Sequence, residues 1–225
     1  MNNNLLLKKI EELREKEILS SNDKKLLWRS AFNLNSEVRV NVAETLALFP
    51  SCFSKHLLLM LANDRNDLVR ANACDSLSSC GEKVVLIKLC KRTNDKYYLV
   101  RGYAALSLAD VQINIGEPYT IGLECLRTKL NTEMDDWVKV CIYRSIILLG
   151  DKSVLNDYLI LFKFGDYYVK NMFLFLANDF MSMLDKGELL LLHDCLEEAI
   201  VSGEKSLQNK TRIAFQSVNY LLEVN

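Results

Sequence analysis

The stretch Asn66-Asp67-Leu68-Val69-Arg70-Ala71-Asn72-Ala73-Cys74 decides how this chain folds, because its pattern returns at regular intervals. An Asn stands three residues before a Val, a basic residue follows the Val directly, and a small apolar residue comes four positions after it. Copies of the pattern are centred on Val38, Val69, Val100, Val138, Val169 and Thr211. Consecutive copies are 31, 31, 38, 31 and 42 residues apart, and a period of this size is typical of repeated helix pairs.

Apolar residues follow the anchors at offsets of 4, 8 and 11, as in the third copy with Ala104, Leu108 and Val111, and among these offsets only Asn219 of the last copy breaks the pattern. At 100° per residue these offsets fall on one narrow stripe of a helix. The Asn or Asp three residues before most anchors can cap that helix, and another apolar, helix-prone stretch precedes it. The sequence therefore predicts six helix pairs, whose second helices begin near residues 36, 67, 98, 136, 167 and 209. It also predicts an N-terminal capping helix over residues 4–19, with Leu6, Ile10 and Leu13 on its inner face.

Neither helix of such a pair can bury its apolar face alone, so the pairs are expected to stack on one another. This predicts an all-α fold: a right-handed α-α superhelix, or solenoid, that forms a single domain over residues 1–225. The chain has only 8 Gly and 2 Pro in 225 residues, which is too few turn residues for a β-sandwich or a β-barrel.

The motif resembles the HEAT-repeat family, especially its short bacterial form, in which an Asp-rich turn precedes Val-Arg and small apolar residues occupy offsets four and five. Three copies here carry those features: Val38-Arg39 with Val42-Ala43, Val69-Arg70 with Ala73-Cys74, and Val100-Arg101 with Ala104-Ala105. The resemblance covers nearly the whole chain from about residue 22. It is looser in later copies, where Lys139 and Lys170 replace Arg and where Tyr143 and Leu174 fill offset five. It implies an armadillo-like architecture more than a function, because HEAT arrays serve many roles.

The cysteines and the apolar runs predict a cytoplasmic protein. The seven cysteines are odd in number, contain no CxxC pair and lie mostly in apolar helical stretches, which favours buried thiols in a reducing compartment. The N-terminal residues are not expected to form a signal peptide, because no basic segment followed by a long apolar core occurs there. The longest apolar runs, such as 57–62 and 172–177, are too short to cross a bilayer.

A basic residue follows each anchor, and these residues are expected to form a ladder along the solenoid. Acids such as Asp64, Asp67, Asp95, Asp135 and Asp166 stand in the turns, and HEAT arrays are similar in using Asp–Arg contacts to join neighbouring units. The ladder is therefore predicted to be structural, with a track for phosphate or an acidic partner as the alternative. Its members are Arg39, Arg70, Arg101, Lys139, Lys170 and Arg212.

Aromatic residues cluster where the third to fifth second helices begin, and Tyr and Trp are common anchors of protein partners. Offsets two, three, six and nine of these helices carry few charges, and in related solenoids such positions line the concave surface. A lightly charged groove suits a protein or peptide better than a polyanion; the alternative is that these residues pack between neighbouring helices. The candidate partner-binding residues are Tyr97, Tyr98, Tyr103, Trp137, Arg144, Tyr167, Tyr168 and Phe175.

Signals for catalysis or for a cofactor are sparse. The only histidines are His56 and His193, and each has one cysteine nearby, whereas a structural zinc site takes four ligands. No GxGxxG, Walker A or GxSxG motif occurs. The sequence predicts no catalytic residue, no metal and no cofactor.

The predicted function is a non-catalytic scaffold or adaptor of bacterial type, with an immunity-type or complex-subunit role. It is expected to be a monomer that binds another protein, and Tyr98→Ala or Trp137→Ala should weaken that binding. One alternative is a HEAT-like DNA glycosylase, since Asp136 beside Trp137 is similar to the catalytic Asp and the tryptophans of that class; the net charge of −1 argues against a nucleic-acid partner. The other alternative is a phycobilisome-lyase type of assembly factor, which shares the repeat.

Overall fold

The structure, a computed structural model, describes residues 2–202 and 204–224, and it is all-helical in this part of the chain. The described residues form thirteen α-helices, three short 3-10 helices and no strand. After α1, the helices alternate as six pairs. The prediction of an all-α repeat fold with six helix pairs and an N-terminal capping helix is confirmed.

The helices form two compact units, residues 1–125 and residues 126–225. We call them unit 1 and unit 2 and describe each by itself. The helix α8 (Thr120–Leu130) runs across the boundary. The assignment of residues 1–225 to one domain, like the hand of the superhelix, stays a prediction.

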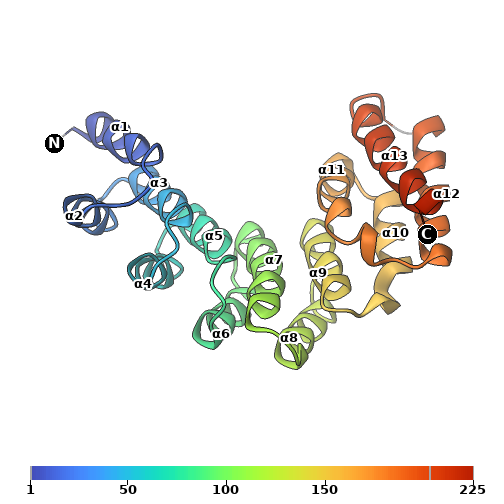
Figure 1. Cartoon of the computed structure of the whole chain (residues 1–225), viewed down its shortest axis with the longest axis horizontal. Coiled ribbons are helices and arrows are strands. Elements are labelled where there is room, and N and C mark those ends of the chain that lie inside the picture. The colour runs from blue at the N-terminus through green and yellow to red at the C-terminus, as the bar shows by residue number, and fades with distance from the viewer. Residues whose placement is uncertain (1, 203, 225) are drawn as a thin grey trace. The chain divides into compact units, whose positions relative to one another are not determined.

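Unit 1 contains the first three helix pairs in two rows (Figure 1). The first helices of the pairs, here called A helices, are α2 (Ser21–Ser30), α4 (Cys52–Leu61) and α6 (Lys83–Arg92). The second, or B, helices are α3 (Ser36–Ala47), α5 (Asp67–Ser76) and α7 (Tyr98–Ile115). The helix α1 (Asn3–Leu13) packs on α3, and α3, α5 and α7 pack on one another in order. The capping helix is shorter than predicted, but its expected inner face is buried: Leu6, Ile10 and Leu13.

Unit 2 contains the later pairs, in which α9 packs on α10 and α11, and α12 packs on α13. Short 3-10 helices, η1 (Lys152–Val154), η2 (Ala177–Asp179) and η3 (Met181–Met183), fill the connections. The α-helices are α9 (Asp136–Leu148), α10 (Leu155–Phe164), α11 (Tyr167–Leu176), α12 (Lys186–Ser202) and α13 (Gln208–Val224).

The repeat anchors explain why the B helices begin where they do. The anchor side chains are buried, and three of the Asn or Asp residues three positions earlier accept a hydrogen bond from the anchor's own N–H. For Asn66 and Val69 this bond is 3.2 Å long. In the last copy, the Thr211 hydroxyl is buried and donates to the carbonyl of Leu207 at 3.0 Å, so the polar anchor is satisfied within its own helix.

The longer interval between Val100 and Val138 is taken up by additional residues at the end of α7 and in the turn that follows it. Helix α7 continues to Ile115 and ends at Gly116, whose φ of 94° is a conformation that glycine adopts readily. The second longer interval is taken up by η3, by the length of α12 and by the turn that precedes α13.

Candidate functional site

Arg39 and Arg70, the first two basic residues of the ladder, each connect two consecutive turns by hydrogen bonds. The Nε and Nη2 atoms of Arg39 donate to the two carboxylate oxygens of Asp64, each at 2.7 Å, while Nη1 donates to the carbonyl of Asn33 at 2.6 Å. Arg70 repeats the arrangement one unit later, with Asp95 at 2.9 and 2.8 Å and the carbonyl of Asp64 at 2.9 Å. Both guanidinium groups are buried. Each Arg therefore bonds its own turn and the next turn simultaneously.

These contacts lower the pKa of the aspartates in the turns. Burial raises the pKa of Asp64 and Asp95, but the hydrogen bonds from Arg39 and Arg70, together with backbone N–H donors, outweigh burial and hold the pKa of both carboxyls below the usual value. The same bonds raise the pKa of Arg70. Both carboxylates therefore stay ionised, and each one is neutralised by the arginine with which it pairs.

The other four basic residues of the ladder lie near the start of α7, α9, α11 and α13. Arg101 donates to the carbonyls of Asp95 and Lys96, each at 3.2 Å. Lys139 pairs with Asp136 of its own helix at 2.8 Å, so it joins no turns. Within the described residues, Lys170 and Arg212 form no ion pair. The six positions look equivalent in the sequence, but Lys139 differs from Arg39 and Arg70, each of which pairs with a carboxylate of the next turn.

Two of the predicted partner-binding groups are tyrosine pairs at the start of B helices. In unit 1, the rings of Tyr97 and Tyr98 meet edge to face with centroids 5.2 Å apart. In unit 2, the rings of Tyr167 and Tyr168 do the same at 5.5 Å. The two pairs differ in exposure. Tyr97 is partly buried, and this burial raises its pKa, whereas Tyr168 is 71% exposed. Each pair places two aromatic rings beside a turn.

The other predicted residues occupy different environments. Tyr103 in unit 1 and Trp137 in unit 2 are half-buried. Phe175 is 72% exposed on α11. Arg144 is buried: its Nε and Nη2 atoms lie 2.8 and 2.7 Å from Asp179 in η2. Arg144 thus lies inside unit 2 as an ion pair, while Phe175, at the same offset of the next repeat, faces solvent.

An open groove of about 450 Å³ runs beside α13 in unit 2. It lies on the B-helix positions that the sequence assigned to the concave face, since Asn178, Ile213, Ser217 and Tyr220 occupy offsets two, six and nine. The same offsets, applied to the last repeat, locate Ile213, Ser217 and Tyr220 in the sequence. None of the lining residues is charged: Asn178, Met181, Ser182, Ile213, Gln216, Ser217, Tyr220 and Leu221. Amides and hydroxyls beside an exposed tyrosine can hold the backbone and side chains of a peptide.

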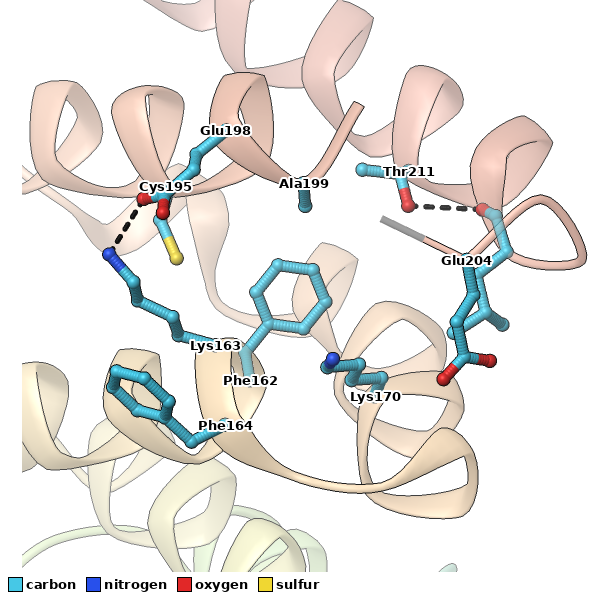
Figure 2. Close-up of a pocket in the computed structure, with 10 residues that line it drawn as sticks. Phe162, Lys163, Phe164, Lys170, Cys195, Glu198, Ala199, Glu204 and Thr211 are labelled. Carbon is cyan, nitrogen blue, oxygen red and sulfur yellow. Dashed lines mark hydrogen bonds and ion pairs between the residues drawn. The ribbon is translucent and has the colours of Figure 1, made fainter. Parts of the chain in front are cut away.

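A smaller cavity of about 230 Å³ lies among α10, α11, α12 and the turn before α13. Figure 2 shows the Phe162 ring at its centre, with Lys163 bonded to Glu198 on one side and Lys170 with Glu204 on the other. The Phe162 ring stacks on Phe173 at 4.5 Å. Because four separate segments supply the wall, spacing in the sequence does not reveal this cavity. Two lysines and two glutamates line the cavity, so its charge favours neither an anionic nor a cationic ligand.

The histidines form no enclosed site. Nδ1 of His56 lies 2.6 Å from the carbonyl of Cys52, one turn earlier in α4, and 3.4 Å from its sulfur. On α12, possible ligand atoms of His193, Asp194 and Glu197 lie within 4.8 Å of one another. Both carboxylates there are exposed, and the His193 ring packs on Phe215 at 4.7 Å. Among the described residues, no helix combines the length and the apolar character needed to cross a membrane.

Comparison with known proteins gives the family of the first repeats. Residues 24–109, which lie within unit 1, match the family model described as HEAT repeats. Comparison with curated proteins gives no match. Among solved structures, the chain is similar to an engineered protein whose crystal structure is known, with a TM-score of 0.50 and 16% identity over 88% of this chain and 97% of the other. This likeness concerns the fold alone.

Proposed function

We propose that this chain, a helical-repeat scaffold with HEAT repeats over residues 24–109, is a non-catalytic adaptor that binds a segment of another protein in the groove beside α13. The observation that carries the proposal is the uncharged lining of that groove at B-helix positions. Charged ligands such as nucleic acid require basic residues, which this groove lacks. A peptide requires hydrogen-bonding amides and apolar contact, which the groove offers.

The tyrosine pairs extend this proposal to the turn edge. Tyr167 and Tyr168 are exposed and their rings contact each other at the N-terminus of α11, and tyrosine anchors lose little conformational entropy on binding because they have only two χ angles. Tyr97 and Tyr98 offer the corresponding edge in unit 1. We place the protein in the cytoplasm, because all seven cysteines are free and a reducing compartment keeps thiols in that state.

The test is affinity capture with the full chain from its native cell extract, followed by quantitative mass spectrometry. Ser217→Arg introduces a long cation into the uncharged groove. Thr128→Arg, at an exposed position of α8, is the matched control. We expect one protein to be enriched by the wild type and by Thr128→Arg and to be lost with Ser217→Arg.

Two results would overturn the proposal. One is that Ser217→Arg captures the same proteins as the wild type in equal amounts. The other is tight, salt-dependent binding of duplex DNA that Ser217→Arg leaves unchanged, because that result would assign the chain to the nucleic-acid class. Circular dichroism of both variants checks that the helices are intact.

A further inference from the structure

Charge is unevenly divided between the two rows of helices in unit 1. The A helices α2, α4 and α6 carry eight Lys and Arg side chains and one carboxylate, which is Asp23. The B helices α3, α5 and α7 carry three Arg side chains and five carboxylates. Because α2, α4 and α6 form one row (Figure 1), unit 1 has one strongly basic side although the chain has a net charge of −1.

Most of these A-helix cations have no internal partner. Lys55 pairs with Glu82 at 2.6 Å, and Arg92 pairs with Asp95 at 3.1 Å. The single carboxylate, Asp23, is already used, because it caps α2 and accepts from Lys16 at 2.9 Å. Six cations of the row form no ion pair with any described residue: Lys24, Lys25, Arg29, Lys83, Lys88 and Lys91.

The positive charges are close enough to affect one another. Burial lowers the pKa of Lys88, and the like charges of Arg92 and Lys91 lower it further. An acid on a neighbouring element would have raised it instead. The field of α6 is therefore not neutralised within the protein, in contrast to the paired guanidinium groups of Arg39 and Arg70 in the B helices.

Apolar side chains lie between these cations on the same exposed faces. Trp28 on α2 and Phe32 in the turn after it are half-exposed, and their rings meet edge to face with centroids 5.6 Å apart. On α6, Val84 and Ile87 are half-exposed between Lys83 and Lys88. The spacing of three and four residues places each apolar group beside a cation on one helix face.

We propose that the A-helix row of unit 1 docks an acidic amphipathic segment of a partner protein. Carboxylates of that segment pair with the free cations of α2 and α6, and its apolar side chains cover Trp28, Phe32, Val84 and Ile87. A nucleic acid uses the cations but leaves the aliphatic groups facing phosphate. A membrane surface needs apolar groups that penetrate the headgroups, whereas these four are only 45–59% exposed. The proposal is independent of the groove beside α13.

The test uses the full chain and a labelled synthetic helical peptide that carries Leu at every third or fourth position and Glu between them. Fluorescence polarisation at low salt measures its affinity, and a peptide with Gln for every Glu is the control. We expect Lys25→Glu with Arg29→Glu, and separately Lys88→Glu with Lys91→Glu, to weaken binding by about tenfold or more. Trp28→Ser, which changes no charge, should also weaken it.

The matched control is Lys186→Glu with Arg212→Glu, which makes the same change of net charge at two exposed positions of unit 2. It should leave the affinity within about twofold, since distant exposed charges are screened. Ser217→Arg should also bind the peptide normally, which separates this proposal from the groove. The proposal is overturned if the Gln peptide binds equally well, if the unit 2 control loses as much affinity, or if duplex DNA or phosphatidylserine vesicles bind more tightly through the same lysines while Trp28→Ser has no effect.

Discussion

The Arg70–Asp95 pair should contribute far more to stability than the Lys139–Asp136 pair, although both basic residues occupy the same repeat position. Arg70 and Asp95 have side chains only 7% and 5% exposed, and Arg70 also donates to two backbone carbonyls. Removing one partner of a buried pair costs about 3–5 kcal/mol. Arg92, at 3.1 Å from Asp95, keeps the carboxylate partly paired, so we expect Arg70→Ala to cost about 3 kcal/mol in free energy of unfolding.

Urea unfolding followed by circular dichroism measures this cost. Lys139→Ala is the control, because its pair is 26% and 49% exposed, and such a surface pair contributes no more than about 1 kcal/mol. The reasoning is refuted if the two substitutions shift the unfolding midpoint equally, because burial and turn-to-turn bonding would then add nothing to an exposed contact within one helix.

The same pair gives the prediction a pH dependence. The pKa of Asp95 is lower in the folded chain than its ordinary value, because the bonds from Arg70 and the backbone outweigh burial. A depressed folded pKa contributes stability above the unfolded value of about 3.9 and loses it as the pH falls through the folded pKa. The difference between the wild type and Arg70→Ala should therefore be constant near neutral pH and shrink below about pH 4. A difference that grows on acidification would contradict this account.

Three further outcomes follow from buried groups. The Tyr158 hydroxyl is buried with no hydrogen-bond partner among the described residues, so Tyr158→Phe should stabilise the chain by about 1 kcal/mol in thermal unfolding, and a lower melting temperature would contradict this. Burial raises the pKa of Cys74 to about 12 and that of Cys141 as well, so a thiol reagent at mildly alkaline pH should label exposed Cys52 first and these two only in denaturant. Gly165→Ala would push a Cβ atom into Val169 and the carbonyl of Leu161 and should cost about 2 kcal/mol, whereas Gly187→Ala, with 3.4 Å to its nearest neighbour, should be neutral.

The repeat could be read from sequence because its signals are local. A buried Val such as Val69, a cap such as Asn66 and an apolar stripe all lie within one helix and its first turn. Helical periodicity and capping chemistry therefore locate the B helices without knowledge of any neighbour. The start of α9 at Asp136 and of α11 at Tyr167 follows from the same signals.

The site residues could be predicted less completely, because their surroundings come from other elements. The offset of Arg144 predicts an open face, yet its side chain is only 10% exposed and pairs with Asp179 in η2, whose side chain is 37% exposed. Lys139 occupies the position of Arg70 but carries a single ammonium, which bonds an acid of its own helix. A guanidinium group has a fork of donors that serves a carboxylate and a carbonyl together. Which ladder residue joins two turns therefore depends on the side chain and on the next turn.

A net charge near zero does not exclude an anionic partner, because the fold separates positive from negative side chains. The value of −1 is a sum over all 225 residues, and it does not show that the A helices and the B helices of unit 1 carry different charge. The acids of the B-helix turns are engaged by Arg39 and Arg70, so they do not offset the cations of α2 and α6 on the other row. Electrostatic attraction falls off within about 10 Å at ordinary salt concentrations. A partner at the A helices would therefore respond to the local excess of positive charge, and a balanced sequence is compatible with a strongly basic docking surface.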